Sequence, residues 1–376
     1  MIYLDNNATT AVDPEVSEAV FSSLRRDTGN PSSSHFSGRK AKESVEHARL
    51  IVADLLGCRP EEIYFTSGGT ESNNLALTGT AMAHKKGHII VSAIEHPSVL
   101  NTCRHLESLG FETTFTPVDR DGVVIPAEIK RSIRQDSFLI SVMHSNNETG
   151  AIQPVEEIGR IAKQQGITFH TDAAQTIGKS PFSVGLMPDI IDMVTIVSHK
   201  FYGPKGVGAL FIKNGTRINP ILFGAGHERG MRPGTENVPG IVGLAKACEI
   251  AKRDIKLRVS HTAHLSAALF SRLRELLPDS ALNAEKAHRL PNTLNILFPG
   301  VNAYALVEKL KDRVAFSSGS ACHAGLCRPS GVLKNMGLSD GEALSSVRLS
   351  VGKDNTEDEI NTAADLIAGA VRELRT

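Results

Sequence analysis

Short apolar segments alternate with stretches of helical periodicity over residues 60–215, and this alternation limits the possible fold more than any other feature of the chain. The segments have strand length and lie at 63–66, 88–93, 138–143, 168–171, 194–198 and 209–213. Strands that alternate with helices at this spacing form a mostly parallel sheet with both faces covered. The sequence therefore predicts a large α/β domain.

The C-terminal third of the sequence predicts a second, smaller domain of α+β type. After a long helical pattern over about residues 238–277, strands are expected at 293–297, 314–317 and 346–351, and helices at 303–311, near 331 and after Thr356. We place the domain boundary within the long helix. Residues 13–257 would form the large domain, and residues 1–12 and 258–376 the small one.

Composition excludes several classes of protein. A chain of 376 residues is long enough for two cores, and its 41 basic residues equal its 41 acidic ones, so it has no charge signature for binding nucleic acid or an anionic membrane. It has no apolar run of membrane-spanning length and does not begin like a signal peptide. Its five scattered cysteines favour a reducing compartment over a disulfide framework. We expect a cytoplasmic globular protein.

Asp172 and Lys200 each follow a predicted strand. The carboxyl ends of parallel strands meet at one edge of a sheet, so both side chains can face the same crevice. Enzymes that use pyridoxal 5'-phosphate (PLP) need such a pair, because a lysine holds the aldehyde as a Schiff base and a carboxylate keeps the pyridine nitrogen protonated. An isolated pair is more often a solvated lysine and a strand-ending aspartate. The choice between this interpretation and a PLP site therefore depends on the surrounding residues.

Three strand-to-helix turns carry further polar residues. In the turn at 66–74, Gly69 and Thr70 can bind an anion at a helix N-terminus, although an ordinary capped turn is equally compatible. His96 can stack on a cofactor ring and exchange protons, whereas a lone histidine is more often structural. Asn147 lies in a turn by default, and its amide is a candidate ligand for a cofactor oxygen or a substrate carboxylate.

Residues 317–327 form a small, polar segment that contains two thiols, Cys322 and Cys327. A buried structural cysteine would not normally occur in such a sequence, and His323 could stabilise a thiolate at Cys322. A zinc site is the alternative interpretation, but the two cysteines lack the usual spacing and a second pair. We therefore predict no metal site and expect Cys322 to be a reactive thiol.

Arg348 alternates with apolar residues on a predicted strand. A guanidinium that projects into a cleft can bind a carboxylate through two hydrogen bonds. From spacing alone, a surface arginine on an edge strand is the commoner outcome.

In chain order these motifs resemble the cysteine desulfurase and selenocysteine lyase family of class V, fold-type I PLP enzymes. The matching stretches are residues 3–10, 29–33, 68–74, 199–206 and 228–237. The resemblance runs over essentially the whole chain. It implies a fold-type I PLP-dependent transferase with a large, mostly parallel sheet of the seven-stranded type and a smaller α+β domain.

The resemblance also implies a role for each matching residue. In the family pattern, Lys200 would bind the PLP aldehyde and move the substrate α-proton, Asp172 would pair with the pyridine nitrogen, Gln175 would bond the phenolic oxygen, and His96 would stack on the ring. The phosphate would be bound by Gly69, Thr70, Ser198 and His199 and by Thr235 of a second subunit, which implies a homodimer. Asn147 and Arg348 would hold the substrate carboxylate, and Cys322 would accept the sulfur as a persulfide.

The implied activity is a cysteine desulfurase, a sulfurtransferase that converts L-cysteine to L-alanine and passes the sulfur to an acceptor protein such as an iron–sulfur scaffold. Selenocysteine lyase is the alternative, because Val197 occupies a position where desulfurases often have serine, and residues 321–323 are closer to the lyases. Pro97 and residues 317–322 are closer to the desulfurases. An aminotransferase and a non-catalytic relative are further options. Cys327 is expected to be incidental.

Overall fold

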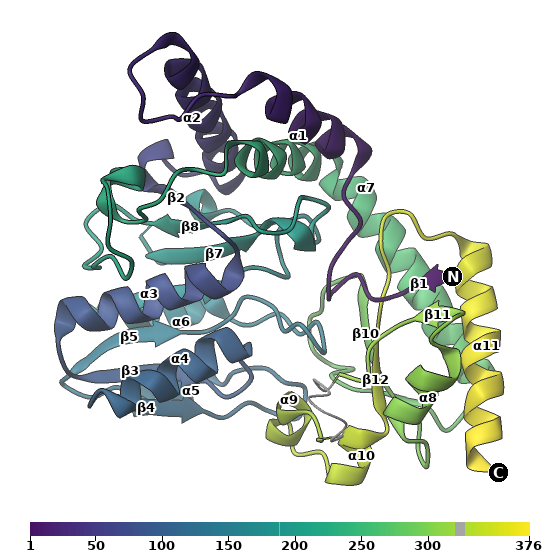
Figure 1. The fold of residues 1–376 in the computed structure, drawn as a ribbon. Coiled ribbons are helices and arrows are strands. Elements are labelled where there is room, and N and C mark those ends of the chain that lie inside the picture. The colour runs from purple at the N-terminus through teal and green to yellow at the C-terminus, as the bar shows by residue number, and fades with distance from the viewer. Residues whose placement is uncertain (188, 320–327) are drawn as a thin grey trace.

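A seven-stranded sheet forms the centre of the larger part of the molecule in the computed structural model, which describes residues 1–187, 189–319 and 328–376 (Figure 1). Its strand order is β2-β8-β7-β6-β5-β3-β4. The strands are β2 (Ile63–Thr66), β3 (His88–Ser92), β4 (Glu112–Thr116), β5 (Ser137–Ser141), β6 (Thr168–Asp172), β7 (Met193–Val197) and β8 (Gly208–Ile212). Strands β4, β3, β5, β6 and β7 pair in parallel, which confirms the predicted mostly parallel sheet.

Strand β8 runs antiparallel to both of its neighbours. The connection from β7 to β8 covers only residues 198–207, whereas a parallel crossover needs about a dozen residues or more. The chain therefore turns back at the end of β7. This short return contains the 3-10 turn Ser198–Lys200, which leaves Lys200 at the carboxyl edge of the sheet.

Helices cover both faces of the sheet, and strand residues alternate between the two cores. Ile89 and Val91 of β3 pack with helices α3 (Gly69–His84) and α4 (Pro97–Ser108), whereas Ile90 belongs to the core on the opposite face. That second core also contains residues of α1 (Pro14–Arg26), α2 (Phe36–Leu56), α5 (Pro126–Ser132), α6 (Val155–Gln164) and the first half of α7 (Val238–Leu276). The period of two follows from the pleat of a strand.

A separate core lies in the C-terminal part of the chain. Strand β10 (Thr293–Leu297) pairs antiparallel with β12 (Ser346–Ser350) and β9 (Ala281–Leu282), while β1 (Ile2–Tyr3) pairs in parallel with β11 (Val314–Ala315). The helices here are α8 (Ala303–Leu310), α9 (Gly331–Asn335), α10 (Asp340–Leu344) and α11 (Glu357–Arg375). Leu4 and the second half of α7 belong to this core, which supports the proposed division of the chain near the middle of α7. The boundary at residue 257 stays a prediction.

The sequence pattern missed several elements, including α1, α2, α5 and β4, and set several strand ends too late. Helices α1 and α2 lie before residue 60, where the alternation begins, and β4 is an edge strand with the mostly polar sequence ETTFT. Ala93, Met143 and Ser198 were predicted to end strands, but they lie just beyond them. These residues begin the loops at the carboxyl edge. Among the described residues, no helix is long and apolar enough to cross a membrane.

A buried ion pair connects the segment before α7 to the sheet. Arg49 donates to both carboxylate oxygens of Glu228, at 2.6 and 2.8 Å, and the backbone N–H of Phe65 donates to the same carboxylate at 2.8 Å. The side chains of Arg49 and Glu228 are 3% and 2% exposed, so neither charge is solvated. The pair can persist only because each charge compensates the other.

The substitution Glu228→Gln is expected to lower the free energy of unfolding by about 3 kcal/mol, because it leaves the buried Arg49 guanidinium with only the half-exposed Glu46 carboxylate as a counter-charge. Urea denaturation followed by circular dichroism measures the change. The matched control is Glu61→Gln, which removes the exposed partner of Arg59 and should change stability by less than about 0.5 kcal/mol. Equal effects of the two substitutions would contradict this account of the buried pair.

Candidate active site

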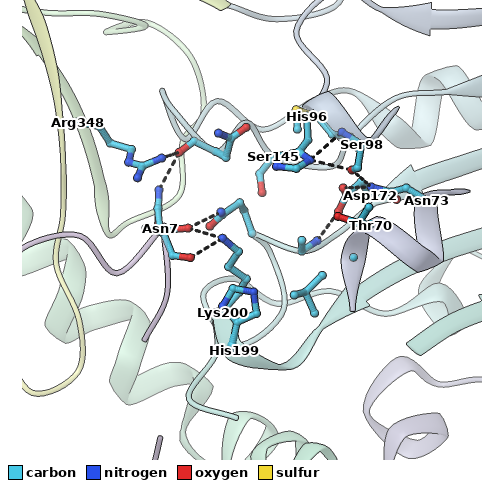
Figure 2. Close-up of a pocket in the computed structure, with 17 residues that line it drawn as sticks. Asn7, Thr70, Asn73, His96, Ser98, Ser145, Asp172, His199, Lys200 and Arg348 are labelled. Atoms are coloured by element: carbon cyan, nitrogen blue, oxygen red, sulfur yellow. Dashed lines mark hydrogen bonds between the residues drawn. The ribbon is translucent and has the colours of Figure 1, made fainter. Parts of the chain in front are cut away.

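A pocket of ≈ 430 Å³ lies at the carboxyl edge of the parallel strands (Figure 2). The predicted site residues that line it are Gly69, Thr70, His96, Asn147, Asp172, Gln175, His199, Lys200 and Arg348. They come from the beginnings of α3 and α4, from the segments that follow β5, β6 and β7, and from β12. The pocket thus brings together residues that lie up to 341 positions apart in the sequence, from Asn7 to Arg348.

Asp172 is the last residue of β6 and is 5% exposed. The backbone N–H of Ala174 donates to its Oδ1 at 2.9 Å, and Nδ2 of Asn73 donates to its Oδ2 at 2.8 Å. These two donors fix the carboxylate at the pocket wall. A buried carboxylate held in this way can accept a proton or a hydrogen bond from a cationic ring nitrogen.

The Nζ of Lys200 donates to the backbone oxygens of Asn7 and Ala8, at 2.8 and 2.7 Å. Burial and, to a smaller extent, Arg348 lower the pKa of Lys200 to about 8, while Asp172 and Asp5 oppose the shift. Desolvation is the main cause because it penalises the charged amine. Lys200 therefore becomes a neutral nucleophile at a mildly alkaline pH, at which an ordinary lysine is still protonated.

His96 is the N-cap of α4, and its ring accepts the backbone N–H of Ser98 at Nδ1 over 3.1 Å. Because Nδ1 is an acceptor, the proton of the neutral ring is on Nε2. Burial lowers the pKa of His96; Asp172 opposes this shift and Lys200 adds to it. Asn73 donates to Ser98 as well as to Asp172, so these side chains form the continuous network drawn in Figure 2.

The N-terminus of α3 provides N–H donors at one end of the pocket. Its N-cap is Gly68, which supplies no side-chain hydrogen bond to the helix. A Cβ added at Gly69 would lie 2.7 Å from Cγ2 of Val197, so only glycine allows the helix to approach β7 this closely. His199 also lines the pocket, and Nδ1 of its ring lies 3.1 Å from the Thr9 hydroxyl. This end suits a phosphate group.

At another part of the pocket, Arg348 already has partners. Its Nη2 pairs with Asp5 at 2.7 Å, and its Nη1 donates to the backbone oxygen of Asn147 at 3.0 Å. Its buried Nε has no hydrogen-bond partner among the described residues. A substrate carboxylate would therefore meet a guanidinium that Asp5 holds in place.

Two predicted site residues, Ser198 and Thr235, are not among the residues that line this pocket. Ser198 is fully buried, and its hydroxyl has no hydrogen-bond partner among the described residues. Its predicted role in binding the phosphate remains a prediction. Thr235 is exposed on the segment before α7. Cys322 lies outside the described residues, as do His323 and Cys327. Within the described ranges, no group of three His, Cys, Asp or Glu side chains could hold a metal ion.

The sequence interpretation did not assign a role to several lining residues, notably Asn7, Asn73, Ser98 and Ser145. Asn73 lies one helical turn after Gly69, so the spacing of four residues would have placed it on the same helix face. Ser98 follows His96 by two residues, which fits a capping contact. Asn7 had no local signal, because its place depends on contacts with residues more than 100 positions away.

The donor set fits PLP. The N–H groups of α3 suit a phosphate, the Asp172 carboxylate suits a protonated pyridine nitrogen, and the Lys200 amine suits an aldehyde. The neutral His96 ring can stack on an aromatic face without repelling a cationic ring. The pocket volume lies within the usual range for cofactor sites, about 300–1,000 Å³.

The rate at which the PLP-free protein takes up PLP is expected to rise with pH with a midpoint near 8, because the amine must lose its proton before it can attack the aldehyde. Below this pH Lys200 is charged and unreactive; above it the free amine predominates. Absorption spectroscopy between pH 6 and 10 measures the rate. The control is a free lysine derivative, whose midpoint lies at about 10.4. A midpoint above 10 for the protein would contradict the lowered pKa.

Comparisons with known proteins agree with this geometry. The family model described as "Aminotransferase class-V" matches residues 2–362. Over its full length, the chain is 46% identical to "Cysteine desulfurase IscS" of Anaeromyxobacter dehalogenans, covering 93% of that protein, and 42% identical to the protein of the same name from Dictyoglomus turgidum, covering 95%.

Solved structures give the same result. The structure titled "NIFS-LIKE PROTEIN" has a TM-score of 0.92 and 39% identity, covering 99% of this chain and all of that one. The structure titled "Crystal structure of DndA from streptomyces lividans" has a TM-score of 0.78 and 38% identity, covering 93% and 99% of the two chains.

Proposed function

The chain belongs to the class-V aminotransferase family, and on this basis we propose that it is a PLP-dependent cysteine desulfurase with the fold-type I architecture. It converts L-cysteine to L-alanine and transfers the sulfur. The observation that carries the proposal is the placement of Lys200 and Asp172 in one pocket, in a chain 42–46% identical to relatives named cysteine desulfurase. We propose iron–sulfur cluster or thio-cofactor synthesis as the destination of the sulfur, through an acceptor protein in the cytoplasm.

Each described residue has a proposed task. When bound, PLP supplies an aldehyde and a ring that withdraws electrons from the substrate α-carbon. Asp172 would hold the ring nitrogen, Gln175 the phenolic oxygen, and His96 one ring face. Gly69, Thr70 and His199 would hold the phosphate, and we propose that Ser198 assists them. Asn147 and Arg348 would orient the substrate carboxylate.

Lys200 would also serve as the base of the reaction. Its Nζ would take the α-proton of the substrate, which the lowered pKa permits near neutral pH. The carbonyl groups of Asn7 and Ala8 accept hydrogen bonds from the same nitrogen. They can therefore stabilise the ammonium that forms when Lys200 takes the proton. His96, with its proton on Nε2, can exchange a proton above the ring.

The proposed sulfur acceptor is Cys322, on the basis of the sequence. Its thiolate would attack the substrate sulfur, so that a sulfur–sulfur bond forms and the carbon–sulfur bond breaks. The electron pair of the broken bond stays with the substrate carbon, which is protonated on the way to alanine. The described cysteines are poor alternatives, because burial raises the pKa of Cys58 and of Cys103 to about 12 and also raises that of Cys248.

The test of the proposed function is turnover of L-cysteine by the PLP-loaded protein in the presence of a thiol reductant. One alanine is expected for each sulfide released, without any keto acid as amino acceptor. Alanine formation that requires a keto acid would indicate an aminotransferase instead. A purified protein that remains colourless after PLP is added would indicate a non-catalytic relative.

Selenocysteine lyase is the second candidate. Val197 occupies a position where desulfurases often have serine, and this residue lines the pocket and packs against Gly69. Alanine release from L-cysteine and L-selenocysteine discriminates between the two activities. A Cys322→Ala variant that loses activity with cysteine but keeps it with selenocysteine would favour the lyase.

We also propose a homodimer in which Thr235 of one subunit reaches the pocket of the other. Thr235 is exposed here, and the preceding segment contains Leu222 and Phe223, which are 45% and 88% exposed. Large apolar side chains that are left in water favour an interface. Light scattering should give a mass of twice 40.4 kDa; a monomer would contradict the proposal.

A further inference from the structure

Lys179 is a buried lysine whose side chain contacts Asn7 and Gln175, two residues that line the pocket. It has no role in the proposed reaction. It is 7% exposed. Its Nζ donates to Oε1 of Gln175 at 2.6 Å and to Oδ1 of Asn7 at 2.9 Å. Within the described parts of the chain it has no ion pair with a carboxylate, and the two oxygens that accept its hydrogen bonds belong to neutral amides.

The contact with Gln175 selects one orientation of that amide. Because Nζ of Lys179 donates to Oε1 of Gln175, Lys179 holds the amide oxygen on its own side and leaves Nε2 on the other. One N–H of Nε2 donates to the backbone oxygen of Asn7 at 2.9 Å. The second N–H remains available to a ligand in the pocket, which Gln175 lines. A turned amide would instead present an oxygen acceptor.

The contact between Lys179 and Asn7 links Lys179 indirectly to Lys200. The side chain of Asn7 accepts from Lys179 and from Asn292, and donates to Thr293 at 2.8 Å. Its backbone oxygen accepts both Gln175 and Lys200. A shift of Asn7 would therefore move the carbonyl that receives the Lys200 amine.

We infer that Lys179 is a positioning residue, which orients the Gln175 amide as a hydrogen-bond donor to the phenolic oxygen of PLP and fixes Asn7 beneath Lys200. The inference rests on the proposed PLP-dependent function. Burial also lowers the pKa of Lys179 well below its usual range. A neutral amine has two N–H groups, which matches the two acceptors that surround it.

The test is a double-mutant cycle with Lys179→Met and Gln175→Ala, measured in the absence of substrate. PLP affinity of the PLP-free protein and the pH dependence of the absorption of bound PLP are the readouts. Lys179→Met is expected to weaken PLP binding about tenfold and to shift the absorption transition by about one pH unit in the wild-type background. In the Gln175→Ala background the same substitution should weaken affinity by clearly less than about tenfold, because only the contact of Lys179 with Asn7 remains.

Controls separate positioning from a general loss of charge or folding. Arg258→Met removes another buried cation, which contacts the Tyr202 ring and borders the same small cavity as Lys179, and should leave PLP affinity unchanged. If Lys179→Met does not fold, as judged by circular dichroism, Lys179→Gln replaces it in the cycle.

Equal effects of Lys179→Met in both backgrounds, or equal weakening by Arg258→Met, would overturn the inference. An unchanged affinity and spectrum in Lys179→Met would overturn it as well. A wild-type protein that binds no PLP would instead refute the proposed function, so the two failures are distinguishable.

Discussion

Replacing Lys200 with alanine is expected to lower the rate of alanine formation from L-cysteine by at least about 10³-fold, because the substitution removes the base that takes the α-proton. The amine also binds the PLP aldehyde, so the visible absorption of the purified protein should change with the loss of activity. Alanine release under saturating L-cysteine and the absorption spectrum are the two measurements. The expected loss is larger than that for any residue that only orients the cofactor.

The matched control is Lys205→Ala, five residues further along the same turn. Lys205 is exposed and does not line the pocket. Its removal should change the rate of alanine formation by less than about twofold, since exposed side chains contribute little to a distant reaction. If Lys200→Ala retained a rate within tenfold of the wild type, the assignment of the base would be wrong.

The substitution Cys322→Ala is expected to lower alanine formation from L-cysteine by at least about 100-fold, because it removes the nucleophile that accepts the sulfur. PLP affinity and the absorption spectrum should remain unchanged, because the proposed cofactor contacts come from other residues. This separation of binding from turnover distinguishes a sulfur acceptor from a residue needed for folding.

Cys327→Ala is the control for the second thiol of the same segment. We expect it to retain activity within about twofold of the wild type, because only one thiolate is required for the transfer. A large loss in Cys327→Ala together with normal turnover in Cys322→Ala would exchange the roles of the two cysteines. Normal turnover in both variants would refute a persulfide on this segment.

The architecture was predictable from the sequence where strands are buried on both faces. Strands β3, β5 and β7 are rich in apolar residues, because helices cover both sides of a parallel sheet. The edge strand β4 could not be found in this way, because its sequence ETTFT is mostly polar and four of its five residues are at least partly exposed. The predicted strands end too late in the sequence, because the loops at the carboxyl edge begin with residues that are mostly buried and so continue the pattern of a strand.

The site was predictable where a residue lies at the end of an element that the pattern identifies. Asp172, Lys200 and His96 all follow predicted strands, and the structure brings them to one pocket. Asn7 was not predictable, because an N-terminal segment reaches the pocket only through long-range hydrogen bonds. Lys179 was missed because its sequence context does not reveal that it is buried. The proposed role of Thr235 involves a second subunit, so a single chain does not test it.

Identification of the sulfur-bearing residue by mass spectrometry after incubation with L-cysteine tests the central claim most directly, because it requires the cofactor, the base and the nucleophile to act together. The account predicts one additional sulfur atom on the peptide that contains Cys322, dependent on PLP and absent from Lys200→Ala. Alanine formation with no persulfide on Cys322 would contradict it.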